Sequence, residues 1–153
     1  MSFRLERQQL VRRGIEEVFA FFSDPTNLEA ITPPWLNFRV LETPAGPLRE
    51  LSEISYRLRV RGIPFSWRSL ISRWEPPFVF VDEQLEGPYQ SWIHRHTFEV
   101  QNGSTLVRDR VDYSVPGGAI VNSLFVRHDL KKIFDYREES LRTALESVER
   151  GQV

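Results

Sequence analysis

The last third of the sequence carries a hydrophobic stripe that continues for about thirty residues. Its members recur at steps of three and four: Val126, Leu130, Ile133, Leu141, Leu145 and Val148. Arg137 takes the position between Ile133 and Leu141. This spacing places side chains on one face of an α-helix, so we predict a helix over residues 118–148. A helix of about 45 Å needs a large apolar surface to cover its stripe.

The chain upstream of this helix alternates apolar and polar residues with a period of two, which is typical of β-strands. Seven strands are predicted, over residues 3–11, 37–42, 51–60, 63–74, 78–85, 89–101 and 104–115. Two short helices, over residues 15–22 and 25–31, follow the first strand. Short turn-forming links between the later strands indicate an antiparallel meander. The predicted class is α+β, in a single domain over residues 1–153.

Composition restricts the classes of partner. The formal net charge at pH 7 is −1, so no overall field favours nucleic acid or an anionic membrane. The absence of cysteine excludes disulfides and thiolate metal sites and fits a reducing, cytoplasmic location. The first ten residues are charged and alternating, unlike a signal peptide, and no apolar run is long enough for a membrane span.

The pair Asn102-Gly103 lies between two alternating segments and predicts a hairpin with a two-residue turn. In this register His96 lies opposite Asp109, and Trp92 lies opposite Tyr113. One face of the hairpin is then charged, and the other is mostly apolar. The apolar face carries Trp92, His94, His96, Phe98, Val107, Asp109, Val111 and Tyr113. A slip of one residue would break this pattern at every pair.

The two histidines and the aspartate on the apolar face need polar partners, since an unpaired buried charge is very costly. We expect His96 and Asp109 to pair across the ladder, with Cβ atoms about 5 Å apart. Such a pair should raise the pKa of the histidine and lower that of the acid. The residues alone leave two roles open: a structural pair in a filled core, or the polar wall of a cavity for a small molecule.

A metal site is a third interpretation of the same residues. His-x-His on a strand places both rings on one side, and Asp109 could complete a triad with His94 and His96. The sequence places no further acid or histidine clearly beside them, so we expect no metal and no cofactor. His128 is expected at or near the surface. A metal-binding cupin barrel is disfavoured, because Glu99 should face outward and the terminal helix is too long for that fold.

The other strands predict further interior positions. Residues 54, 56, 58 and 60 should face inward from one strand. On residues 63–74, Ile63, Phe65, Trp67 and Ile71 share a face, so Trp67 is expected inside, although Leu70 and Trp74 lie on the opposite parity. For residues 78–85 either Asp82 and Gln84 or Glu83 point inward, because the length of the connection 86–88 decides the face.

Several segments carry a family resemblance: Val18-Phe19-Ala20-Phe21-Phe22-Ser23-Asp24, Asn27-Leu28, Thr32-Pro33, Gly87-Pro88-Tyr89, Trp92-x-His94-x-His96-x-Phe98 and Arg108-Asp109-x-Val111-x-Tyr113. They resemble the START-like, Bet v 1-like superfamily, also called SRPBCC, and within it a bacterial ligand-binding subgroup similar to polyketide cyclases and dehydrases. The resemblance implies a helix-grip fold. In that fold a curved antiparallel sheet of about seven strands, in the order β-α-α-β6-α, wraps around the long C-terminal helix.

The helix-grip fold implies a tunnel between sheet and helix that binds a small hydrophobic or aromatic molecule, such as a lipid or a polyketide-like metabolite. The expected ligand-binding residues are Trp67, Trp92, His94, His96, Phe98, Asp109, Val111, Tyr113, Ile133 and Phe134. Phe125 is expected on the far wall, with Gly117-Gly118 and residues 24–34 at the mouth. We expect a monomer or homodimer.

Two other functions stay open, because one fold hosts many activities. The first is a cofactor-independent cyclase, dehydratase or hydrolase, with His96 as general acid or base oriented by Asp109 and His94 as a further candidate. The second is a protein-interaction or co-chaperone module whose interior is filled. The state of the interior, open or closed, distinguishes this module from the other two functions.

Overall fold

One antiparallel sheet of seven strands forms the frame of the molecule, in the order β1-β7-β6-β5-β4-β3-β2. The computed structural model describes residues 1–151, with side chains up to Glu146. The strands are β1 Phe3–Val11, β2 Arg39–Glu42, β3 Glu53–Val60, β4 Ile63–Glu75, β5 Val79–Glu86, β6 Ser91–Gln101 and β7 Ser104–Ser114. From β2 to β7 each strand pairs with its neighbour in the chain, so the predicted meander is confirmed.

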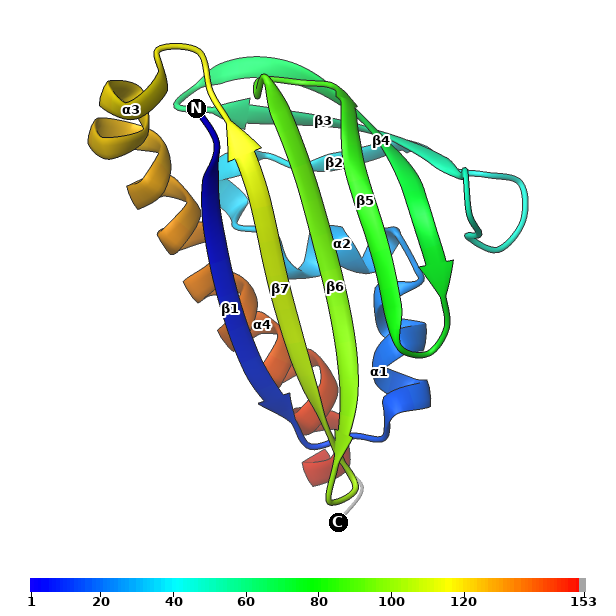
Figure 1. The fold of residues 1–153 in the computed structure, drawn as a ribbon. Helices are drawn as coiled ribbons and strands as arrows, with labels where there is room; N and C mark the ends of the chain where they lie inside the picture. The colour runs from blue at the N-terminus through cyan, green and yellow to red at the C-terminus, as the bar shows by residue number, and fades with distance from the viewer. Residues whose placement is uncertain (152–153) are drawn as a thin grey trace.

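The helices lie on one side of this sheet (Figure 1). Between β1 and β2 come α1 Ile15–Phe22, α2 Thr26–Ile31 and the short 3₁₀ helix η1 Pro34–Leu36. After β7 come α3 Gly118–Val121, the π-helical turn η2 Asn122–Val126 and the long helix α4 Arg127–Gly151. The sheet curves around α4, which confirms the predicted α+β helix-grip fold.

The C-terminal helix differs from the continuous α-helix expected over residues 118–148, because η2 interrupts it. The π turn presents Asn122 to the interior, where its Oδ1 accepts a 2.6 Å hydrogen bond from the Tyr113 hydroxyl. The predicted stripe is otherwise present, with Leu130, Leu141 and Leu145 buried. The side chain of Val148 lies outside the described residues. Among the helices described, none combines the length and apolar character needed to cross a membrane.

Two hydrophobic clusters fill the space between sheet and helices. The first joins α1 to the sheet: the ring of Phe19 lies 5.2 Å from that of Phe98 and 5.9 Å from that of Phe80. The second lies between β6, β7 and α4 and includes Trp92, Tyr113 and Phe134. Each such side chain stabilises the fold by about 1.5–3 kcal/mol when fully buried. The two clusters therefore hold the sheet to the helices at separate places.

A β-bulge in β4 explains why both parities of this strand contain apolar residues. The pairing of β4 with β5 shifts between Ile71 and Arg73, and an extra residue reverses the faces of the strand beyond it. Trp67 and Trp74 therefore both pack against the core. Ile63 shares the face of Phe65 and Trp67, as predicted, since it lies opposite Val60 in the ladder, but it is exposed because it directly follows the tight turn after β3.

Candidate functional site

A cavity of about 650 Å³ lies between the inner face of the sheet and α4. Its walls come from β3 to β6, from the segment α2–η1 and from α3, η2 and α4. Most lining residues are aromatic or aliphatic: Leu28, Trp35, Leu36, Phe38, Tyr56, Leu58, Val60, Phe65, Trp67, Tyr89, Trp92, Val126, Leu130, Ile133 and Phe134. Polar side chains are few among them, and four of these gather in one place: Asp82, His94, His96 and Arg137.

The β6–β7 hairpin places the two histidines in the wall, in the register that the sequence predicts. His96 pairs with Asp109, His94 with Val111 and Trp92 with Tyr113. The turn residues Asn102 and Gly103 have φ of 49° and 81°, as a type I′ turn requires. Both imidazoles are buried. They stack with ring centroids 3.7 Å apart and planes inclined by 25°.

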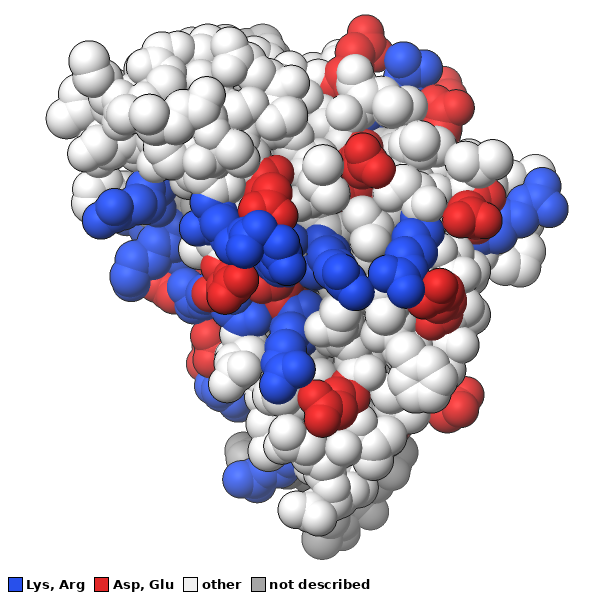
Figure 2. Space-filling model, viewed as in Figure 1, with Lys and Arg blue, Asp and Glu red and all other residues white. Residues whose placement is uncertain are grey.

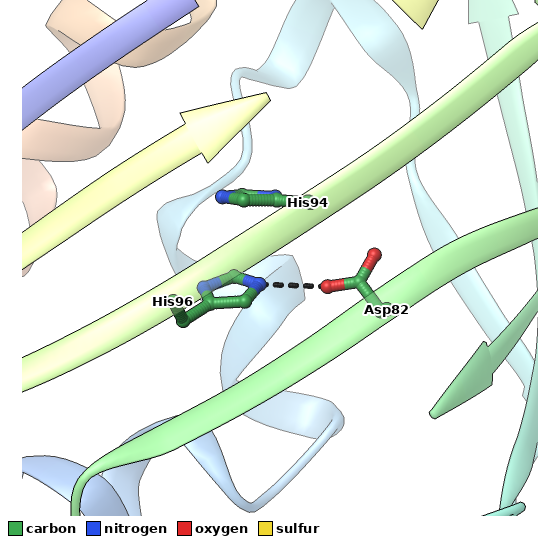
Figure 3. Close-up of side chains that lie close together, drawn as sticks. All are labelled: Asp82, His94 and His96. Carbon is green, nitrogen blue, oxygen red and sulfur yellow. Dashed lines mark hydrogen bonds and ion pairs between the residues drawn. The ribbon is translucent and has the colours of Figure 1, made fainter. Parts of the chain in front are cut away.

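The structure decides which acid of strand β5 points inward, Asp82 or Glu83. Phe80 is buried, and Asp82 lines the cavity, so this parity faces inward. His96 Nε2 donates a 2.7 Å hydrogen bond to Asp82 Oδ2 (Figure 3). Gln84, on the same parity, instead binds the backbone of Tyr89 through both its amide nitrogen and its oxygen. The Gln84 contacts fix the β5–β6 connection, which decides the face of the strand.

His96 and Asp109 lie opposite each other in the ladder, as predicted. The expected hydrogen bond between them is wrong, because Asp109 binds His94 instead. Asp109 Oδ1 accepts a 2.7 Å hydrogen bond from His94 Nε2. Its distance to His96 Nδ1 is 3.5 Å, and that nitrogen has no hydrogen-bond partner in the described part of the chain. Each acid therefore binds the histidine diagonal to it, because the diagonal neighbour is also within reach on a sheet face.

The pKa of His96 falls to about 4, opposite to the expected rise. Burial is the main cause, and the adjacent His94 adds to it, whereas the hydrogen bond and negative charge of Asp82 oppose the fall. Burial alone would raise the pKa of Asp109, but Arg137 and the bond from His94 hold it below its ordinary value. The pKa of Asp82 is likewise lowered against burial, by its hydrogen bond with His96.

Arg137 on α4 also belongs to this site, although the sequence analysis placed it on the inner stripe of the helix without giving it a role. Its Nη2 lies 3.7 Å from Asp109 Oδ1 and has no hydrogen-bond partner among the residues described. Its guanidinium carbon lies 5.4 Å from the ring centre of Phe22 and 5.6 Å from that of Phe134. The sequence offered one signal for such a role, namely a cationic residue at a position of the stripe that is otherwise apolar. We call Asp82, His94, His96, Asp109 and Arg137 the polar cluster.

Aromatic residues form the wall next to the polar cluster. The rings of Trp67 and Trp92 meet edge to face with centroids 5.4 Å apart. Tyr89 packs on Trp92 at 4.7 Å. Trp67 Nε1 donates a 2.9 Å hydrogen bond to Ser69 Oγ, so its polar atom has a partner while its ring faces the cavity. Such rings offer a large rigid apolar surface to a ligand.

Six of the ten expected ligand-binding residues line the cavity: Trp67, Trp92, His94, His96, Ile133 and Phe134. The other four lie behind this lining. Phe98 and Val111 are packed inside the two hydrophobic clusters, Tyr113 is bonded to Asn122, and Asp109 lies behind His94. Their strand parity is inward, but neighbouring side chains cover them.

Two expectations for the C-terminal helix have different outcomes. The prediction that Phe125 lies on the far wall is wrong, because this side chain is exposed. Its ring centre lies 4.8 Å from the guanidinium carbon of Arg61. His128 is exposed, as predicted. Asp129, which lines the cavity instead of Phe125, binds Arg61 through both carboxylate oxygens.

Three side chains have the donor types of a metal site. One possible ligand atom from each of Asp82, His94 and His96 lies within 4.8 Å of the others. Figure 3 shows the three side chains together, from the neighbouring strands β5 and β6. The third donor is Asp82 rather than the Asp109 that the sequence suggested.

Comparisons with known proteins agree with this architecture. The model of a family described as "Polyketide cyclase / dehydrase and lipid transport" matches residues 11–138. No curated protein matches the chain. Among solved structures, the protein CV1439 from Chromobacterium violaceum is similar with 15% identity and a TM-score of 0.72, over 95% of this chain and 98% of that one.

Two further structures show the same fold. Major latex-like protein 151 from Panax ginseng has 13% identity and a TM-score of 0.69, over 94% of this chain and 97% of its own. The di-domain aromatase/cyclase StfQ of the steffimycin biosynthetic pathway has 12% identity and a TM-score of 0.77. That match covers 100% of this chain and 53% of StfQ. At these identities the likeness concerns the fold alone.

Proposed function

The chain belongs to the polyketide cyclase/dehydrase and lipid transport family, and from this premise we propose that it binds a small hydrophobic or aromatic molecule in the cavity between the sheet and α4. The observation that carries the proposal is the cavity itself, at about 650 Å³. Sites for small molecules are commonly 300–1,000 Å³, mostly apolar, with a few polar groups that fix orientation.

The lining supports an aromatic or polyketide-like ligand with oxygen substituents. Trp67, Tyr89 and Trp92 offer ring faces and edges against which a flat ligand can stack. Arg137 lines the cavity, and its buried Nη2 has no hydrogen-bond partner among the described residues. A ligand carbonyl or phenol oxygen that accepts from this nitrogen would offset the cost of its burial.

The surface formed by α3 and η2 is uncharged and apolar, which would suit the entry of an apolar ligand. No Lys, Arg, Asp or Glu occurs between Asp112 and Arg127, and Figure 2 shows the corresponding uncharged region at the upper left. Ile120 is 72% exposed and Leu124 is 60% exposed there. Val121, on the adjacent turn, lines the cavity. We propose that a hydrophobic molecule enters past this segment.

A cavity-filling substitution tests the binding function. The fluorescent apolar probe 1-anilinonaphthalene-8-sulfonate should bind the protein saturably, and native mass spectrometry should reveal a small mass that leaves on denaturation. Ile133→Trp introduces a large ring into the cavity and should weaken probe binding severalfold. Ile93→Trp, on the exposed face of β6, is the matched control and should leave it unchanged. Equal probe affinity in the two variants would contradict the proposal.

A cofactor-independent enzyme is the second candidate, and the placement of His96 favours it. This imidazole lines the cavity, is oriented by Asp82, and is unprotonated near pH 7 because its pKa is lowered to about 4. Such a ring can act as a general base on a carbonyl substrate, although its low pKa makes it a weak one near pH 7. His96→Gln should then abolish turnover of a poly-β-ketone thioester while probe binding persists. Unchanged turnover would exclude this role. The co-chaperone hypothesis required a filled interior, so the cavity disfavours it.

A further inference from the structure

We propose that Asp82, His94 and His96 form a binding site for a divalent transition-metal ion in the wall of the cavity. This inference rests on the proposed function and deepens it. The metal would bind at the polar side of the same cavity, where it can contact the bound molecule. The three donors come from adjacent positions of β5 and β6, where Asp82 lies directly opposite His94 in the ladder and bonds to His96.

The donor set is the first argument. Two imidazoles and one carboxylate are ligands that suit zinc, iron or cobalt, and three protein donors leave coordination positions for water or a substrate. One candidate ligand atom from each residue lies within 4.8 Å of the others. Small rotations of three side chains therefore suffice to converge on one ion. All three residues line the cavity, so the remaining positions would face a bound molecule.

The surroundings of His94 are the second argument. In most metal sites a ligating histidine donates its other ring N–H to a carboxylate, a backbone carbonyl or water, which fixes the ring and raises its basicity. His94 Nε2 donates in this way to Asp109 Oδ1 at 2.7 Å, leaving Nδ1 for a metal. Asp109 lies behind His94 and does not border the cavity. It is thus placed to support a ligand rather than to be one.

Charge is the third argument. The polar cluster contains two carboxylates, Asp82 and Asp109, but a single guanidinium. Arg137 Nη2 lies 3.7 Å from Asp109 Oδ1, and among the described residues no ion pair joins this guanidinium to Asp82, which feels its charge at longer range. A divalent cation between Asp82 and the two rings would supply the missing positive charge.

Cobalt titration tests the site. The protein, stripped with EDTA and dialysed, is titrated with Co²⁺ while its visible d–d absorption is recorded, and Zn²⁺ is then added as competitor. We expect one Co²⁺ per chain, displaced by Zn²⁺. Asp82→Asn keeps the shape of the side chain and should weaken Co²⁺ binding at least about tenfold. Glu83→Gln changes the next residue, on the opposite face of β5, and should have no effect.

A measurement on the unaltered protein guards against variants that fail to fold. Imidazole NMR signals of His94 and His96 should shift on addition of one equivalent of Zn²⁺, and those of the exposed His128 should not. Absence of stoichiometric binding, equal affinity in Asp82→Asn, or a shift confined to His128 would overturn the metal site. Probe binding in EDTA separates the two proposals: if it persists without a metal site, the cavity function stands and this inference fails.

Discussion

His94 Nε2 donates a 2.7 Å hydrogen bond to Asp109 Oδ1, although the ladder places Asp109 opposite His96. Asp82 repeats the arrangement on the other side of β6: it lies opposite His94 and binds His96. Each of the two stacked imidazoles is therefore held by a carboxylate from a neighbouring strand, and in both cases the carboxylate lies diagonal to the histidine that it binds. This arrangement fixes both rings at the cavity wall, whether they act on protons, on a ligand or on a metal.

Protonation of His96 should make the metal-free protein less stable in mild acid. The unfolded chain binds a proton at this residue near its ordinary pKa of 6.5, and the folded chain only near 4. The unfolded state therefore holds more protons between these values, and the free energy of unfolding falls as pH decreases from 6.5 to 4. The loss from this group is about 3 kcal/mol, to be measured by urea denaturation in EDTA at several pH values.

The variant His96→Gln isolates this contribution. Its side-chain amide nitrogen can still donate to Asp82 but does not titrate, so the slope of stability between pH 6.5 and 4 should largely disappear. Below pH 4 a loss should remain, because Asp82 and Asp109 have lowered pKa values in the folded protein and must be protonated there. An undiminished slope in the variant would show that another group is responsible.

The hairpin was predictable because its information is local. An Asn-Gly turn sets the register, and alternation along the eleven pairs of the hairpin agrees with it, so the inward positions of His94 and His96 follow from the sequence. The face of β5 was not predictable, because it depends on the bonds of Gln84 to the β5–β6 connection. The hydrogen-bond partners were wrong for a related reason: the diagonal choice requires three strands in place, and the hairpin supplies only two.

In the C-terminal helix, too, the features set by local sequence were predictable and those set by other elements were not. Periodicity placed Leu130, Arg137 and Leu145 on the inner face, where the structure has them. It did not reveal the π turn at residues 122–126, because the bond that accompanies this turn joins Asn122 to Tyr113 on a strand. The role of Arg137 depends likewise on an acid from β7. Sequence patterns thus gave the face of each element, but the partners across elements required the fold.

Loss of the Tyr113 hydroxyl should destabilise the protein. Tyr113→Phe removes the 2.6 Å hydrogen bond to Asn122 and leaves a buried amide oxygen without a donor. The expected loss is about 1–3 kcal/mol of unfolding free energy. Tyr136→Phe, at a half-buried tyrosine of α4, serves as control and should cost less. If both variants unfold at the same urea concentration, the hydrogen bond does not stabilise the π turn.

The turn before the C-terminal helix should require glycine at residue 117. Gly117 has φ of 89°, and a Cβ there would lie 2.2 Å from Cγ2 of Val121. Gly117→Ala should therefore lower stability by at least about 1 kcal/mol and move Val121, which lines the cavity. Gly46→Ala, where a Cβ meets no atom within 4 Å, is the control. Thermal denaturation and probe affinity together check the prediction, and an unaltered Gly117→Ala protein would contradict it.

Arg137 should be needed to keep Asp109 charged inside the protein. Arg137→Met retains most of the apolar contact with Phe22 and Phe134 but removes the cation 3.7 Å from Asp109. Breaking a buried pair in this way costs about 3–5 kcal/mol, because a carboxylate is left uncompensated. Arg142→Met, on the exposed face of α4, should cost far less. The double variant Arg137→Met with Asp109→Asn should recover part of the loss in urea denaturation, since the unpaired charge is then removed. Equal stability of the single and double variants would mean that Arg137 acts through its packing and not through Asp109.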